Sequence, residues 1–231
     1  MFTLKDFKVK LVNGEEVKNF VKRHGEFSKV CYDTPKEKAE KVGEHCLESG
    51  HLSGSRHLYM VFELKNIPRS TADQLVRHTQ GFVTNVQSLR YCNKDGKVSI
   101  YAAPEILDDA YLVHELDLFE SGVQNRYDLI QATLKDSGIT GERANEISRT
   151  ILPIGIATEC NIAVNIECLI HLANVRLCTR AELPIRTIVK QMVNQVIEVE
   201  PRYKPYLVPQ CKKLGYCPES NKECVIYKGV K

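Results

Sequence analysis

The sequence predicts an α+β protein, because strand-like segments occur along the same chain as longer helical ones. Residues 2–12 alternate apolar with polar side chains, and the run from Leu58 to Leu64 is apolar, aromatic and β-branched, as in a buried strand. Residues 106–134 and 184–199 instead repeat their apolar positions at helical spacing. Both kinds of element therefore have to share one core.

Length and charge limit the classes of function. With 231 residues the chain can bury a sizeable core, and we expect a domain at 1–208 followed by a Cys-containing tail at 209–231. The formal net charge of +3 is too small to indicate binding to a nucleic acid polymer. The most apolar stretch, 151–175, is interrupted by charged and polar residues, and the N-terminus does not resemble a signal peptide. We expect a cytoplasmic protein with no membrane partner.

Nine cysteines are present, and their odd number favours reduced thiols over a disulfide framework. Cys211, Cys217 and Cys224 lie in the Lys-rich tail and could bind a metal. The tail has no Cys-x-x-Cys pair and offers no fourth ligand of its own. We therefore expect a reduced or partly disulfide-linked tail and no metal site.

Capping residues mark several helix starts. Thr34 followed by Pro35 and Glu37 predicts a helix that runs to about Ser49 before Gly50 ends it. Residues 49–57, rich in Gly, Ser and His, read as a polar loop that either binds a ligand or is plain surface. Further on, residues 70–73 open a short helix, and a Thr-Gly-Glu run at 140–142 caps another.

The stretch from Arg77 to Tyr91 is the main candidate for a binding site. It combines cationic donors with hydroxyl and amide groups, which suit a bound phosphate ester. A solvated helix end and loop would have the same composition, so the residues alone leave both interpretations open. Helical spacing would place Gln74, Arg77 and His78 on one face. A hairpin turn at 93–96 would place Ser88 and Arg90 on or just before a strand, with both side chains on the same side.

Residues 156–177 read as a mostly buried helix. Asn165 and Arg176 are eleven residues apart, which is close to three helical turns, so we expect both on one face. Each polar side chain needs a partner in so apolar a helix. A structural salt bridge would satisfy Arg176 as well as a ligand would.

The order of these residues resembles a known signature. Gln74, Arg77-His78, Asn85, Gln87-Ser88 and Arg90-Tyr91 resemble the flavin-dependent thymidylate synthases, whose motif is Arg-His-Arg, seven arbitrary residues and Ser. Other landmarks follow in family order and extend the resemblance over about residues 28–190: Cys31–Thr34, Ser49–Ser53 with His57, Arg149 before Leu152-Pro153, and Asn165 to Arg176.

The resemblance implies a fold, an assembly and a reaction. The fold would be a central antiparallel sheet flanked by helices, assembled as a homotetramer with active sites at subunit junctions. The chain would be a methyltransferase that converts deoxyuridylate (dUMP) to thymidylate. Methylenetetrahydrofolate would supply the one-carbon unit, and flavin adenine dinucleotide (FAD) would accept hydride from NADPH.

The resemblance also implies roles for individual residues. Arg176 would be the catalytic residue, because an arginine can polarise the uracil carbonyls where charge develops. The deoxyuridylate-binding set would be Gln74, Ser88, Arg90, Arg149 and Arg176. The FAD-binding set would be Ser53, Arg77, His78, Asn165 and His171. Ser88 is a nucleotide contact in this interpretation, since the flavin chemistry needs no protein nucleophile.

The chain departs from the family pattern at several positions. Thr79 stands in place of the second Arg of the motif and is followed by one extra residue, and Val86 replaces a usual Glu. Arg56 replaces a usual Glu, and Glu167 replaces a usual Arg. Two other functions therefore remain open: a flavoenzyme that modifies carbon 5 of another pyrimidine nucleotide, and a non-catalytic nucleotide-binding relative.

Overall fold

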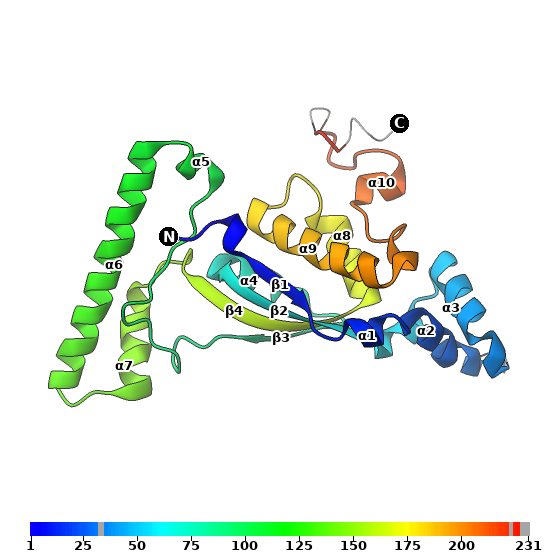
Figure 1. The fold of residues 1–231 in the computed structure, drawn as a ribbon, viewed down its shortest axis with the longest axis horizontal. Helices are drawn as coiled ribbons and strands as arrows, with labels where there is room; N and C mark the ends of the chain where they lie inside the picture. Colours follow the sequence, from blue (N-terminus) through cyan, green and yellow to red (C-terminus); the bar gives the residue numbers. More distant parts are fainter. Residues whose placement is uncertain (32–34, 222–223, 227–231) are drawn as a thin grey trace. The chain divides into compact units, whose positions relative to one another are not determined.

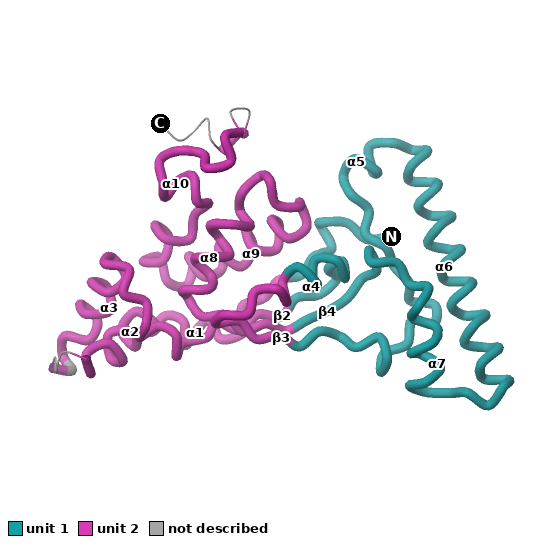
Figure 2. Tube along the Cα trace, turned by 180° about the vertical axis from the view of Figure 1, so that it is seen from behind, with its two compact units in different colours: residues 1–8, 64–74, 85–160 teal, residues 9–63, 75–84, 161–231 magenta. Residues whose placement is uncertain are grey.

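The computed structural model describes residues 1–31, 35–221 and 224–226 (Figure 1). The chain forms two compact units, residues 1–8, 64–74 and 85–160, and residues 9–63, 75–84 and 161–231, called here unit 1 and unit 2 (Figure 2). The strands are β1 (Lys8–Leu11), β2 (Tyr59–Pro68), β3 (Phe82–Val86) and β4 (Ala157–Asn165). The α-helices are α1 (Gly14–Val17), α2 (Phe20–Ser28), α3 (Ala39–Glu48), α4 (Arg69–Leu75), α5 (Pro104–Leu107), α6 (Ala110–Asp136), α7 (Gly141–Ser148), α8 (Ile166–Arg176), α9 (Leu183–Val199) and α10 (Gln210–Leu214).

The four strands form one antiparallel sheet in the order β1-β2-β4-β3, so the expected α+β class is confirmed. No helix in the described part of the chain is both long enough and apolar enough to cross a membrane. The predicted domain boundary at residue 208 remains a prediction. The helix cap expected at Thr34 lies outside the described residues, whereas α3 ends at Glu48 and Gly50 follows with a φ of 72°.

Strand β4 corrects the helix predicted over 156–177. Side chains along β4 alternate between the core and the surface: Thr158, Cys160 and Ile162 are buried, whereas Glu159 and Asn161 are exposed. This period of two is a strand pattern that the high apolar content of the segment concealed. The helix begins only at Ile166, so Asn165 caps its N-terminus while Arg176 is its last residue.

Unit 1 has a core built from its N-terminus and the long helix α6. Phe2, Phe7 and Tyr101 pack as three mutually tilted rings with centroids 5.8 to 6.1 Å apart. Val98 and Val123 are also buried here. Helix α6 runs unbroken for 27 residues and contains most of the stretch with helical spacing. Gly138, with a φ of 77°, follows its end.

The hairpin predicted around residues 93–96 is wrong. No strand is assigned between β3 and β4 in the described chain, and residues 87–99 form turns and loops. Side chains from neighbouring helices hold this loop instead. The Tyr127 hydroxyl accepts a hydrogen bond from the backbone N–H of Lys94 at 3.1 Å, and the Asn145 amide donates to the carbonyl of Arg90 at 2.9 Å. Since Gln131 joins Tyr127 to Asn145, α6 and α7 fix the loop as a unit.

Unit 2 packs α2 against α3 at a glycine contact. A Cβ on Gly25 would lie 1.7 Å from the carbonyl oxygen of Ala39, and one on Gly43 would lie 1.8 Å from that of Val21. Only glycine permits this approach. Arg202 then fastens α3 to the segment after α9, since its guanidinium binds the carboxylates of Glu40, Glu44 and Glu200.

Helix α9 completes the open edge of β1 within unit 2. The Gln195 side chain donates to the carbonyl of Val9 at 2.9 Å and accepts from the N–H of Leu11 at 2.8 Å. The amide thus takes the place of a strand partner on an edge strand. Helix α8 lies beside α9, and its two ends carry the polar groups described next.

Candidate functional site

A polar hollow of about 750 Å³ opens in unit 2 at the N-terminal end of α8. Three segments far apart in the sequence supply its walls: the end of η4 (Ser53–His57), the turn between α4 and β3, and the first turns of α8. The lining residues are Arg56, Arg77, His78, Thr79, Gln80, Gly81, Asn165, Glu167, Cys168 and His171. Four of the five residues expected to bind FAD therefore meet here.

The fifth, Ser53, does not line the hollow. It is exposed at the start of η4, and Arg56, three residues further on, takes part instead. The expected helix face carrying Gln74, Arg77 and His78 is also wrong, because α4 ends at Leu75. Arg77 and His78 lie in the turn that follows, where they can reach α8.

His78 is the centre of the site. Its Nε2 atom accepts a hydrogen bond from Nε of Arg176 at 3.3 Å, and its ring meets that of His171 edge-on at 5.9 Å. Burial lowers the pKa of His78 to about 4, and Arg176 and His171 act in the same direction. The imidazole is therefore neutral near pH 7, with Nδ1 carrying the proton and Nε2 accepting from Arg176.

Arg176 has no carboxylate partner within salt-bridge distance among the described residues. The structural salt bridge considered for it from the sequence is therefore absent from this part of the chain. Its contact with a neutral histidine leaves the positive charge of a half-buried guanidinium uncompensated. A partly buried cation of this kind favours an anionic or carbonyl-bearing ligand.

Asn165 is buried, and its side chain is occupied by the fold. Its Oδ1 atom accepts from the backbone N–H of Cys168 at 3.0 Å and so caps α8. Gly81 lies directly against it: a Cβ on Gly81 would stand 2.3 Å from Nδ2 of Asn165, and the φ of Gly81 is 68°. This close approach brings the turn after α4 onto the helix N-terminus, where free N–H groups attract negative charge.

Two departures from the family pattern bind each other. Arg56 donates from Nε to Oε2 of Glu167 at 2.6 Å and from Nη2 to Oε1 at 3.0 Å. The contact lowers the pKa of Glu167. The resemblance implies Glu and Arg at these two positions in the opposite order, so the exchange does not change the net charge of the rim. The sequence showed both residues but not that they are partners.

The expected deoxyuridylate residues of unit 1 lie on the loop and helices already described. The Ser88 hydroxyl accepts from the N–H of Arg90 at 3.2 Å, and Nη2 of Arg90 lies 3.2 Å from Oε2 of Glu142. Arg149 is exposed just after α7, and Gln74 is half-buried on α4. Arg176 belongs to unit 2, at the end of α8. Each residue is therefore positioned within its own unit.

Comparisons with known proteins agree on one family. The family model described as thymidylate synthase complementing protein matches residues 17–202. The flavin-dependent thymidylate synthase of Nitratidesulfovibrio vulgaris is 34% identical over 177 residues, which cover 76% of this chain and 71% of that protein. The enzyme of the same name from Clostridium tetani is 29% identical over 218 residues, 85% of each chain.

A solved structure has the same fold. It is the UMP/dUMP methylase PolB from Streptomyces cacaoi bound with 5-Br dUMP, which superposes with a TM-score of 0.65 over 87% of this chain and 94% of that one. At 20% identity this likeness concerns the fold alone. The class defined by fold and sequence together is that of the methyltransferases. Within that class, the chain belongs to the flavin-dependent thymidylate synthase family and is a methyltransferase.

Proposed function

We propose that this protein methylates carbon 5 of deoxyuridylate, with methylenetetrahydrofolate as the carbon donor and FAD as the carrier of hydride from NADPH. The observation that carries the proposal is the hollow at α8, where Arg77, His78, Asn165 and His171 come together from separate segments. These four are residues for which family membership implies flavin contacts. The departures at Thr79, Val86 and Glu167 leave that constellation intact.

The lining of the hollow fits a flavin dinucleotide. The volume of about 750 Å³ suits a large cofactor, and Arg77 together with the N–H groups at the start of α8 would hold its diphosphate. FAD would supply hydride transfer and carry the one-carbon unit. The protein would contribute position and electrostatics: neutral His78 orients Arg176, which is poised to stabilise negative charge on the uracil ring.

Ser88, Arg90 and Arg149 would bind the nucleotide, with the arginines directed to its phosphate. Arg90 pairs with Glu142 through an exposed contact that is weakened by solvent screening. It can therefore exchange this carboxylate for a phosphate at little cost in free energy. The expected place of reaction is the cytoplasm.

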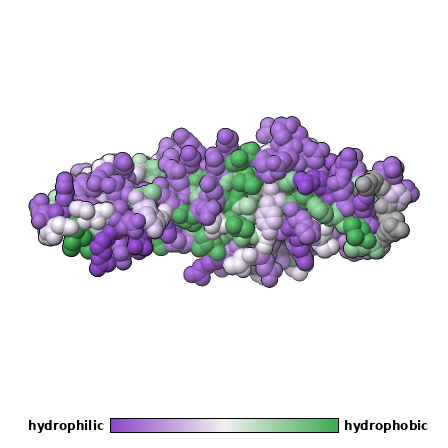
Figure 3. Space-filling model, turned by 90° about the horizontal axis from the view of Figure 1, so that it is seen from below, coloured by the Kyte–Doolittle hydropathy of each residue, from purple (hydrophilic) through white to green (hydrophobic). Residues whose placement is uncertain are grey.

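We further propose that the chain assembles into a homotetramer. Large apolar side chains are exposed along α6: Tyr111 (68%), Leu118 (56%), Phe119 (53%) and Leu129 (59%). Green apolar side chains also lie among purple polar ones on the face drawn in Figure 3. Exposed apolar surface of this extent favours a protein partner. Light scattering on Phe119→Lys should show smaller particles than the wild type, with Lys135→Ala, on the same helix, as the control.

Two measurements test the proposed reaction. The purified protein, reconstituted with FAD, should show flavin absorbance and should release tritium from deoxyuridylate labelled at carbon 5 when given NADPH and methylenetetrahydrofolate. A protein that binds no flavin after reconstitution contradicts the proposal. A panel of uridine and cytidine nucleotides completes the assay, since product formation only from a nucleotide other than deoxyuridylate would show that the substrate is wrong.

A further inference from the structure

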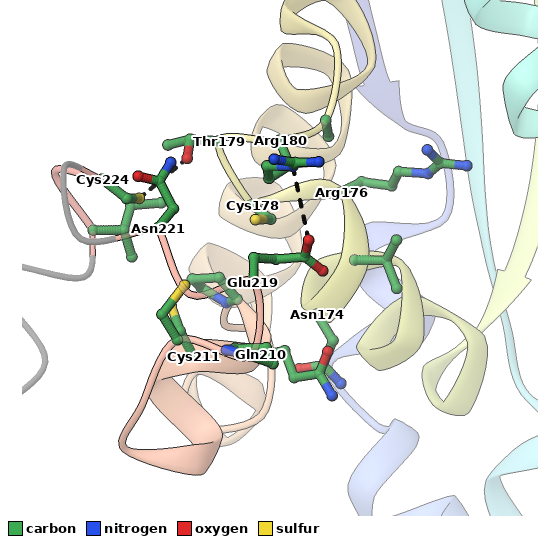
Figure 4. Close-up of a pocket in the computed structure, with 16 residues that line it drawn as sticks. Asn174, Arg176, Cys178, Thr179, Arg180, Gln210, Cys211, Glu219, Asn221 and Cys224 are labelled. Carbon is green, nitrogen blue, oxygen red and sulfur yellow. Dashed lines mark hydrogen bonds and ion pairs between the residues drawn. The ribbon is translucent and has the colours of Figure 1, made fainter.

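The C-terminal tail returns to the far end of α8 and brings four thiols together. Cys178 follows α8 directly, Cys211 is on α10, and Cys217 and Cys224 lie in the segment after it. All four line one hollow of about 240 Å³ in unit 2 (Figure 4). All four are free thiols in this structure. The proposed reaction uses none of them.

The four thiols belong to parts of the chain that are distant in sequence, and they line the same hollow. Three separate parts of the fold, the end of α8, α10 and the last described segment, converge on this one place.

The described part of the tail buries little apolar surface. Leu214, Tyr216 and Val225 are 39%, 57% and 77% exposed, so these apolar side chains contribute little to a core. Its contacts with the rest of unit 2 include the packing of α10 on α8, the pair of Arg180 with Glu219 at 3.7 Å, and the contact of the Thr179 hydroxyl with the sulfur of Cys224 at 3.1 Å. Segments with so small a core are commonly held by a disulfide or a metal.

We propose that Cys178, Cys211, Cys217 and Cys224 form a structural zinc site that fastens the tail to the C-terminal end of α8. The tail alone supplies three thiols, and the fold adds the fourth from a position more than thirty residues earlier in the sequence. Four thiolates suit Zn²⁺, which takes tetrahedral sulfur ligands in structural sites. Each thiol would release its proton to solvent as its bond to zinc forms.

The surroundings are compatible with this site. Arg180 and Glu219 line the same hollow and pair with each other, so together they add no net charge to it. Arg176 points away from the labelled sulfurs in Figure 4, so it remains available for the site at His78. No three His, Cys, Asp or Glu side chains of the described residues already stand at metal-binding spacing. Binding would therefore draw the thiols inward around the hollow.

The zinc content of the full-length protein tests the inference. Protein purified without chelator should contain about one zinc ion per chain, and titration with a mercurial reagent should release it. Cys178→Ser should lose most of this zinc. Cys92→Ser is the matched control, because Cys92 is an exposed thiol on the loop of unit 1, outside the cluster, and should keep it.

A second measurement remains informative if Cys178→Ser does not fold. Wild-type protein exchanged with Co²⁺ should show the intense near-ultraviolet absorbance of thiolate-to-cobalt charge transfer. The proposal is wrong if the wild-type protein contains only a trace of zinc. It is also wrong if thiol titration in denaturant without reductant finds fewer than nine free cysteines, because the missing thiols would then be in disulfides. Neither measurement depends on flavin or on methylation, so this inference and the proposed function can fail separately.

Discussion

The two ends of α8 carry different chemistry although they belong to one helix of 11 residues. At the N-terminal end, Asn165 caps the helix, and Arg56 and Arg77 line the hollow beside it. At the C-terminal end, Cys178 lines a second hollow together with the thiols of the tail. The first set consists of hydrogen-bond donors and cations, and the second of soft sulfur ligands.

The difference follows from the electrostatics of a helix. Its N-terminus attracts anions, so a phosphate-bearing ligand there is stabilised by the backbone itself. Its C-terminus has the opposite polarity and disfavours thiolates unless a cation compensates them, which is what Zn²⁺ would do. The N-terminal end is thus suited to binding an anionic ligand. The C-terminal end carries Arg176, which is proposed to bind the nucleotide, and next to it the thiols that are proposed to hold the tail.

Among the substitutions that test these differences, the one at Arg176 should have the largest effect on activity. Arg176→Ala should lower the rate of deoxyuridylate methylation on the order of 10²–10³-fold, because the side chain that stabilises charge on the uracil is removed. Arg143→Ala, which removes an exposed arginine paired with Glu146, should stay within about twofold. If Arg176→Ala keeps more than about a tenth of the activity in steady-state kinetics, its role is structural.

The contact between Gly81 and Asn165 should give the next largest effect. Gly81→Ala combines strain at positive φ with a clash against a buried amide, and should cost about 2–4 kcal/mol of unfolding free energy. Gly96→Ala is the matched control, because Gly96 also has a positive φ but no atom within 4 Å of the added Cβ. Equal losses for the two variants in chemical denaturation would show that the contact with Asn165 is unimportant.

His78 should make stability depend on pH. Its pKa is about 4 in the fold and near 6.5 when unfolded, so between these values the unfolded chain binds more protons. The unfolding free energy contributed by neutral His78 is therefore fully present above pH 6.5 and decreases as the pH falls toward 4. His78→Asn should show a shallower decline over this interval, whereas His114→Asn, on an exposed part of α6, should follow the wild type.

The smallest effect is expected for the exchanged ion pair at the rim of the hollow. Arg56 and Glu167 are 61% and 41% exposed, so a double-mutant cycle in denaturation should give a coupling below about 1 kcal/mol. Glu167→Arg alone should lower the free energy of unfolding slightly, because it leaves two like charges together. Adding Arg56→Glu should restore that free energy, and its failure to do so would show that the two positions act independently.

The sequence by itself determined the fold class and the family, and it predicted four of the residues that line the hollow at α8. Arg77, His78, Asn165 and His171 could be listed because their types and order follow a family pattern. Local signals were also sufficient where one residue decides the backbone, as at Gly50 and Gly138, whose positive φ values follow the ends of α3 and α6.

Only the tertiary structure decided which residues are partners. Segment 156–165 forms a strand because it pairs within the sheet, although its composition also suits a buried helix. The loop at 87–99 stays irregular because Tyr127 and Asn145 bind its backbone. Arg56 and Glu167 form an ion pair, and Cys178 and Cys211 line one hollow, although the members of each pair are distant in sequence. Their positions depend on how strands and helices pack, which no local pattern encodes.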